Sequence, residues 1–285
     1  MANAISRRDV LRSGAGAALT IAGVSTLAAA EETPPKLDWP VADLHVHLSG
    51  RLSMERAVQV AAERRVKFGI VEHPGHNYRI KTDRDLKRYL DMLEPYPVYR
   101  GIQPVYPRWR KAFSKDLLAK VQYVLMDAQT LPNPDGSFWR IWHSNTQVAD
   151  KHQFMDRYMD FNVQLLTTER LDILAAPTFL PVCIAQDYKA LWTPKRVQTI
   201  IDLALEHSVA IEISENFHVP SADIVKRAKA AGLKFTFGTN SRTPQAAGRL
   251  DYCRKTARQC RLTAKDMYLP KPLPGRDEQD QPTQG

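Results

Sequence analysis

The chain has 285 residues, of which 44% are hydrophobic and 25% charged, and its formal net charge is +9. This composition excludes a disordered or collagen-like chain, and three cysteines are too few for a scaffold built on disulfides. The basic residues form no block interleaved with aromatic residues. We therefore expect a solvated basic surface that suits small anions, and no nucleic-acid partner.

The first thirty residues have the features of an export address. Arg7 and Arg8 precede an uncharged stretch from Ser13 to Ala30. A membrane anchor is the alternative, but many Gly, Ala and Thr residues make this stretch only weakly apolar. The segment resembles a twin-arginine signal peptide, which predicts the twin-arginine export machinery as a partner. It also predicts that the protein is located in a bacterial periplasm. No stable membrane anchor is expected.

After this segment, β-rich runs alternate with helical patterns. Seven strands are predicted, at Val41–His47, Lys67–His73, Val98–Val105, Gln122–Gln129, Leu171–Thr178, Val209–Glu215 and Lys234–Asn240. Helices are predicted between and after them, at Met54–Arg65, Asp83–Glu94, Asn145–Thr168, Pro194–Glu206, Ser221–Ala231 and Tyr252–Arg261. Strand and helix repeated seven times indicate a parallel sheet closed into a barrel with outer helices. We expect residues 31–269 to form this barrel and residues 270–285 to form a disordered tail.

The first strand carries the pattern Asp43-Leu44-His45-Val46-His47. Alternate residues of a strand share a face, so Asp43, His45 and His47 are predicted to point the same way. A lone strand histidine is usually structural. Two imidazoles at the carboxyl end of a barrel strand, however, are well placed to chelate one metal ion.

The second strand ends in Glu72-His73, followed by Pro74 and Gly75. With a histidine pair on the neighbouring strand, we predict that His73 is a third ligand. The alternative for His73 is a surface loop residue.

Two segments interrupt the alternation. Leu131–His143, with two Pro, one Gly and two Trp, is predicted to be a long functional loop or lid, and Leu180–Trp192 a second long loop. Glu212 stands between two isoleucines in the sixth strand, where a buried carboxylate needs a partner or a function. It shapes the site in one interpretation and pairs with a barrel Lys or Arg in the other.

These strands and motifs resemble the polymerase and histidinol phosphatase (PHP) superfamily of metal-dependent phosphoesterases. The resemblance covers roughly residues 41 to 269 and implies a distorted (β/α)₇ TIM-like barrel. The H-x-H of that family corresponds to His45 and His47, and its T-D-H corresponds to Glu72-His73. The resemblance therefore implies that His45, His47 and His73 are metal ligands.

Later positions depart from the family pattern. Gln103 replaces an expected Glu, Asp127 and Gln129 stand near an expected His, and Ala176-Pro177 replaces His-Pro. Asn240 and Arg242 replace the expected Asp and His of the last strand. A neutral amide binds a divalent cation more weakly than a carboxylate does, so we expect at most one tightly held metal ion.

Two interpretations follow. In the first, one Zn, Mn or Fe ion is held by His45, His47 and His73, with Asn240 or Asp127. The protein is then an exported hydrolase of phosphoester type that acts on a small anionic substrate, with Asp127, Glu212 and Arg242 in the site. In the second, hydrolysis has been lost and the barrel binds a small anion or a sugar. An amidohydrolase-type enzyme is a further alternative. Arg242 is interpreted as an anion clamp or as an exposed loop residue.

Overall fold

The computed structural model describes residues 37–75 and 77–272. The predicted signal peptide and nearly all of the predicted tail lie outside this part of the chain. None of the helices in the described ranges combines the length and the apolar character that a bilayer span requires.

Seven parallel strands form a closed barrel, which confirms the predicted fold class. Around the barrel the order is β1, β2, β3, β4, β7, β8, β9, and β9 pairs with β1 through Phe237 and Asp43. The strands span Val41–Val46, Val66–Ile70, Tyr99–Ile102, Tyr123–Met126, Ile173–Leu174, Ala210–Ser214 and Phe235–Gly238. Most of them are buried on both faces, which explains their continuous apolar runs.

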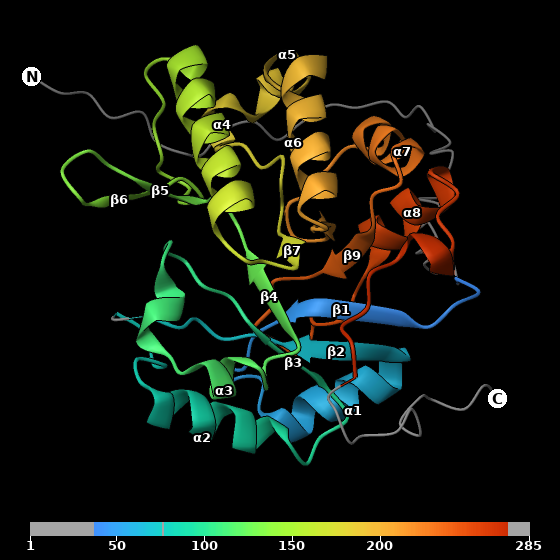
Figure 1. The fold of residues 1–285 in the computed structure, drawn as a ribbon. Helices are drawn as coiled ribbons and strands as arrows, with labels where there is room; N and C mark the ends of the chain where they lie inside the picture. The colour runs from blue at the N-terminus through green and yellow to red at the C-terminus, as the bar shows by residue number, and fades with distance from the viewer. Residues whose placement is uncertain (1–36, 76, 273–285) are drawn as a thin grey trace, which may run out of the picture. The chain divides into compact units, whose positions relative to one another are not determined.

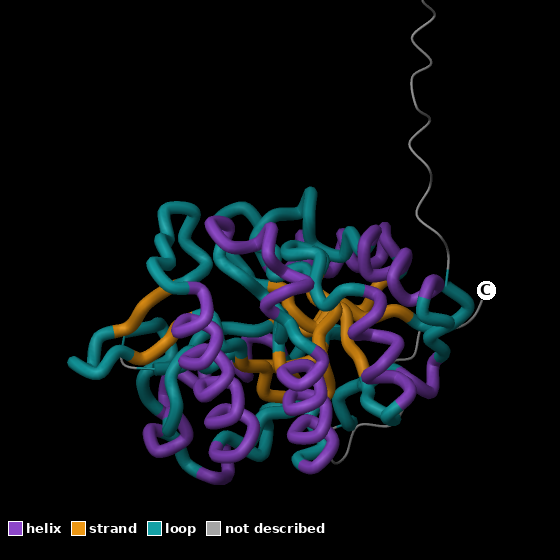
Figure 2. The backbone as a smooth tube through the Cα atoms, turned by 90° about the horizontal axis from the view of Figure 1, so that it is seen from above, coloured by secondary structure: helices purple, strands orange, loops and turns teal. Residues whose placement is uncertain are grey.

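The longer helices lie outside the strands, as Figure 2 shows from above. They are α1 (Met54–Arg64), α2 (Asp83–Leu93), α4 (Lys151–Thr168), α6 (Pro194–Glu206), α7 (Ala222–Ala230) and α8 (Asp251–Gln259). Their starts follow local chemistry. For example, Ser53 caps α1 by accepting from the Arg56 backbone N–H, and Thr82 forms a capping box with Asp85 on α2.

Three element predictions were wrong in detail. Helix α4 begins at Lys151 rather than Asn145, because Asp150 caps its first turn and accepts from two backbone N–H groups. The first predicted loop contains a hairpin of β5 (Thr130–Pro132) and β6 (Phe138–Arg140). The second predicted loop contains a 3-10 helix (Val182–Asp187) and the short α5 (Tyr188–Leu191).

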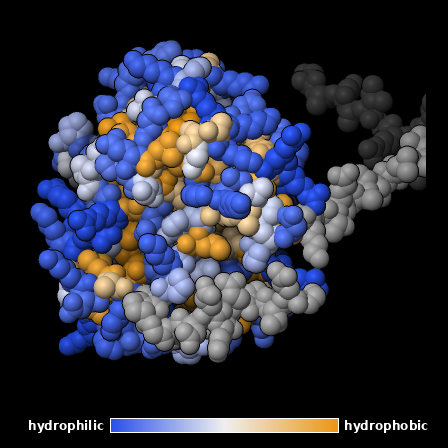
Figure 3. Space-filling model, turned by 45° about the vertical axis from the view of Figure 1, so that its right-hand side comes forward, coloured by the Kyte–Doolittle hydropathy of each residue, from blue (hydrophilic) through white to orange (hydrophobic). Residues whose placement is uncertain are grey.

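The described residues form two hydrophobic cores. One fills the barrel interior below its carboxyl end, where Leu44, Tyr123, Leu125 and Ile173 are almost completely buried. The larger one lies between the strands and the helices. On the surface, hydrophobic side chains gather in a few places among hydrophilic ones (Figure 3). The packed interior leaves the carboxyl end of the barrel as the place where polar side chains converge.

Candidate metal centre

His47, Glu72 and His73 come together at the carboxyl ends of β1 and β2. Each offers one ligand atom, and these atoms all lie within 4.8 Å of one another. In the part of the chain that the structure describes, no other group of three His, Cys, Asp or Glu side chains is this close. The neighbouring strands β1 and β2 bring the three residues together because their carboxyl ends meet at one edge.

His47 is the most unusual member of this cluster. Its side chain is only 1% exposed, yet neither ring nitrogen has a hydrogen-bond partner among the described residues. Burial, followed by the charges of His45 and Arg242, lowers the pKa of His47 well below its ordinary value. The ring is therefore neutral, which is the form that binds a metal ion. A buried imidazole without a partner is costly unless something absent from the protein chain satisfies it.

His73 is held in a fixed orientation. Its Nδ1 donates to the backbone carbonyl of Gln103 at 2.9 Å, which leaves the Nε2 lone pair directed toward the site. The backbone N–H of His73 donates to Glu72 Oε1 at 2.8 Å. Burial lowers the pKa of His73, so this ring is also neutral. Nε2 accepts from Arg242 Nη2 at 3.4 Å.

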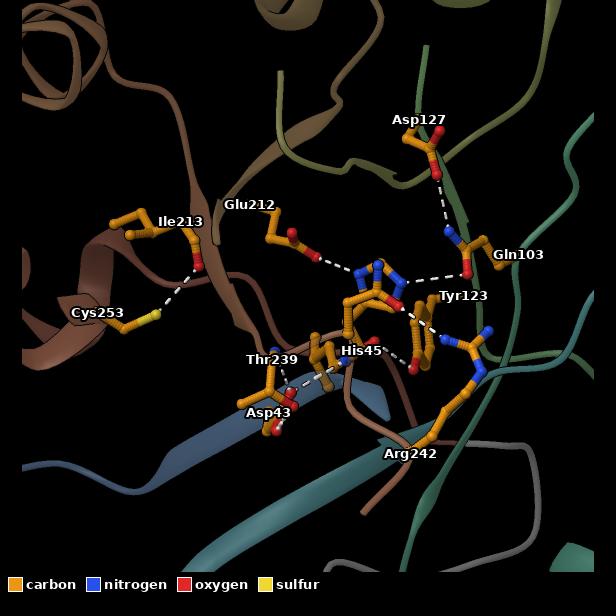
Figure 4. A network of polar contacts seen from close by, with 12 residues as sticks. Asp43, His45, Gln103, Tyr123, Asp127, Glu212, Ile213, Thr239, Arg242 and Cys253 are labelled. Atoms are coloured by element: carbon orange, nitrogen blue, oxygen red, sulfur yellow. Dashed lines mark hydrogen bonds and ion pairs between the residues drawn. The ribbon is translucent and has the colours of Figure 1, made fainter. Parts of the chain in front are cut away.

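His45 belongs to a different arrangement, a line of buried hydrogen bonds across the barrel (Figure 4). Its Nδ1 donates to Glu212 Oε2 at 2.7 Å, and its Nε2 donates to Gln103 Oε1 at 3.1 Å. The Gln103 amide nitrogen in turn donates to Asp127 Oδ2 at 2.8 Å. The line therefore joins residues from β8, β1 and the segments that follow β3 and β4.

The charge on His45 follows from this line. Burial lowers its pKa, but the carboxylates of Glu212, Asp127 and Asp43 outweigh that effect, and the pKa is raised overall. Both ring nitrogens then carry a proton, as the two hydrogen bonds require. In this arrangement His45 has no lone pair for a metal ion, although its ring centroid is only 5.4 Å from that of His47.

Asp43 stands apart from the histidines with which it was predicted to share a face. The pairing of β1 with β2 shifts register between Asp43 and Val46, and this irregularity breaks the alternation of side chains. The Asp43 carboxylate accepts from the backbone N–H groups of His45, Thr239 and Gly248 and from the Thr239 hydroxyl. It therefore fastens the loop after β9 to β1.

Arg242 and Asn240 follow β9 and reach the same end of the barrel. Arg242 Nη1 donates to Asn240 Oδ1 at 3.4 Å. Burial lowers the pKa of Arg242, but a guanidinium remains charged in this range. Arg242 thus places a cation directly beside His73.

The structure sorts the predicted site residues into two sets. His47 and His73 form the cluster with Glu72, and Arg242 and Asn240 adjoin it. His45, Glu212 and Asp127 form the hydrogen-bonded line with Gln103. Glu212 pairs with His45, not with a Lys or Arg. Glu72 is the one cluster residue that the sequence analysis did not predict as a ligand. Its position next to His73, just after β2, could have indicated that role.

The cluster has the donor set of a catalytic metal site. Two neutral imidazoles and one carboxylate match the ligands of several catalytic zinc sites and of mononuclear iron sites. A metal ion held by these three side chains alone would keep positions open for other ligands. The unpartnered ring nitrogens of His47 and the fixed His73 ring both fit a divalent metal ion.

Comparisons with known proteins identify no family. No protein-family model matches the chain, and no curated protein matches it. Among solved structures it is similar to an archaeal ribonuclease P with mature tRNA, at 13% identity and a TM-score of 0.37 over 77% of this chain and 90% of that one. It is also similar to an HpcH/HpaI aldolase from Desulfitobacterium hafniense DCB-2, at 12% identity and a TM-score of 0.36 over 80% and 95%. A third similar structure is a beta-mannanase from Streptomyces thermolilacinus with mannohexaose, at 9% identity and a TM-score of 0.30 over 76% and 89%. Similarity this low says nothing about chemistry.

Proposed function

We propose that the protein is an exported metal-dependent hydrolase that cleaves a small anionic substrate of phosphoester type. The observation that carries the proposal is the buried, unpartnered His47 ring within the three-residue cluster. The resemblance of the first two strands to the PHP superfamily agrees with it. In this proposal His47, Glu72 and His73 hold one divalent ion, either Zn, Mn or Fe.

Such an ion supplies a water molecule of lowered pKa and polarises the scissile group. The protein's own residues supply the rest. Arg242 binds the anionic group of the substrate as a hydrogen-bonding cation beside the cluster. The Gln103 carbonyl keeps the His73 ring in place, while Glu212 and Asp127 fix His45 and Gln103 through the buried line. These residues orient the site before substrate arrives.

The test is a metal analysis of the purified protein followed by assays on phosphomonoesters and phosphodiesters. The proposal predicts about one metal ion per chain and hydrolysis that chelation abolishes and zinc or manganese restores. Protein that contains no metal ion and gains none on incubation with zinc or manganese would contradict it.

One observation favours a second candidate, a barrel that binds an anion without turnover. Gln103 is hydrogen-bonded to both His45 and Asp127, so neither side chain is free to act as an acid or a base on a substrate. This candidate predicts metal and phosphate binding without hydrolysis of any ester in the same panel.

A further inference from the structure

A cleft of about 600 Å³ is formed by residues that follow the barrel strands. Its walls come from the segments after β2 and β3, from β6, and from the segment between β6 and α4. These segments lie at the carboxyl end of the barrel, the same end as His47, Glu72 and His73. Figure 1 shows the hairpin β5–β6 standing out from the barrel next to α4.

A row of aromatic rings connects the cluster with the cleft. The His73 ring lies 5.1 Å from that of Tyr78, and Tyr78 lies 6.0 Å from Tyr106. Tyr106 in turn lies 4.1 Å from Phe138, and both of these rings line the cleft. These contacts place the nearest cleft ring, that of Tyr106, one intervening ring away from His73.

The outer wall of the cleft is fixed in place. Trp139 of the hairpin packs edge-on against Phe154 of α4, with ring centroids 5.7 Å apart. Arg157 of α4 lies over the same Trp139 ring and donates to Asn133 Oδ1 at 2.6 Å. The hairpin is therefore anchored to a long helix, and the wall is formed before any ligand binds.

The polar side chains that line the cleft include three amides beside Arg140, His143 and Thr146. Asn77, Asn145 and Gln147 each present a donor group and an acceptor group. Arg140 adds a cation, and the described residues that line the cleft include no carboxylate. A ligand that satisfies these amides must itself donate and accept hydrogen bonds at several points, as a set of hydroxyl groups does.

The aromatic rings are tilted rather than parallel. The planes of Tyr106 and Phe138 meet at 42°, and those of Tyr78 and Tyr106 at 41°. Tyr106 and Phe138 both line the cleft, so aromatic surface lies beside the amides. The C–H groups of a sugar ring carry the partial positive charge that the face of an aromatic ring attracts.

We propose that this cleft binds a sugar ring, and that the substrate is a sugar that carries its anionic group at the metal centre. The second half of this statement rests on the proposed function, whereas sugar binding by the cleft does not. Phe138 is the residue to test, because its side chain is 40% exposed and lies on the short strand β6. Met92 on α2, at 41% exposed, is the matched control.

The experiment is saturation-transfer NMR on the purified full chain in EDTA, with cellobiose, glucose 6-phosphate, adenosine and benzoate as probes. We expect signals from both sugars, and weakening of their binding by roughly tenfold in Phe138→Ala, because a ring contact is lost. Met92→Ala should bind them as the unaltered protein does. Binding of adenosine or benzoate without either sugar would overturn the inference, as would equal sugar binding by Phe138→Ala.

EDTA separates this inference from the proposed function. The cleft contains none of the three cluster residues, so sugar binding should survive removal of metal. With metal restored, Phe138→Ala should raise KM for glucose 6-phosphate and leave KM for methyl phosphate unchanged. If the protein binds sugars but never holds a metal ion, the proposal of a sugar-binding cleft is supported and the proposal of a metal-dependent hydrolase is refuted. An unchanged KM for glucose 6-phosphate would refute the link between cleft and substrate.

Discussion

At the scale of single residues, the site depends on which imidazole nitrogens are free. His47 has two ring nitrogens without a partner among the described residues and His45 has none, whereas His73 directs Nε2 toward the cluster, where it accepts a long hydrogen bond from Arg242 at 3.4 Å. Two histidines that are separated by one residue in the sequence therefore have different protonation states. The cause is the partner of each ring, since Glu212 holds a proton on His45, whereas none of the described carboxylates is hydrogen-bonded to His47.

The first prediction separates ligands from neighbours. Glu72→Gln removes the only carboxylate of the cluster and should lower zinc affinity by more than about 100-fold, beyond the effect of a typical outer-shell change. His45→Ala should lower it less, since the ring nitrogens of His45 are already engaged. Competition with a fluorescent zinc chelator measures both, with exposed His152→Ala on α4 as the control. Equal losses in Glu72→Gln and His45→Ala would place His45 among the ligands.

The second prediction concerns Arg242. Arg242→Ala should weaken binding of inorganic phosphate by roughly 10-fold to 100-fold, because a hydrogen bond to a charged group is lost. Metal content should not fall, since a guanidinium is not a metal ligand. Calorimetric titration with phosphate measures the first effect and elemental analysis the second. Arg56→Ala on the exposed face of α1 is the control, and unchanged phosphate affinity in Arg242→Ala would contradict the anion-clamp role.

At the scale of elements, close strand packing brings the site residues together. Tyr123 of β4 fills the space beside Gly69 and Gly101, and its hydroxyl donates to the Leu44 carbonyl at 2.8 Å. A side chain on either glycine would overlap this buried tyrosine. The contact ties β4 to β1.

The third prediction tests this packing. Gly101→Ala should destabilise the protein by about 3 kcal/mol, because the new methyl group must displace the Tyr123 ring from the barrel interior. Urea unfolding measures the change. Gly50→Ala is the control, since no atom lies within 4 Å of the added carbon there, and it should stay within about 0.5 kcal/mol. A similar small effect at Gly101 would show that the barrel tolerates rearrangement at this point.

The strands were predictable from sequence, and the hairpin was not. A strand buried on both faces leaves a continuous apolar run, which identified all seven barrel strands within a few residues at each end. Strands β5 and β6 have three residues each, and β6 is largely exposed, so neither leaves a periodic pattern. The hydrogen-bonded line through Gln103 could not be predicted either, because its residues come from β1, β8 and the segments after β3 and β4, which meet only in the closed barrel.

At the scale of the whole molecule, the candidate site lies at the carboxyl end of the barrel. Other polar side chains of the barrel serve to hold its strands and loops together. The described barrel residues include buried carboxylates that act as fasteners, such as Asp43, beside carboxylates that serve the site, such as Glu72. Sequence alone could not separate these roles, because each carboxylate lies within two residues of a histidine in or just after a barrel strand. The register shift in β1 decides between them.

The proposed export is also a property of the whole chain. Replacing Arg7 and Arg8 together by Lys should leave a full-length precursor in the cytoplasm, because the arginine pair is the recognition element of the resembled signal. Fractionation followed by immunoblotting measures this, with Arg12→Lys as the matched control. A mature product that starts near Glu31 in the periplasm of the double variant would contradict the assignment.

The central claim is that His47, with Glu72 and His73, holds a metal ion. Its most direct test is elemental analysis of the purified protein and of His47→Ala after identical incubation with zinc and removal of the unbound ion. The account predicts about one zinc ion per chain in the unaltered protein and little in the variant, since a site with two ligands left binds too weakly to survive the removal step. Equal zinc content in the two proteins, or none in either, would contradict it.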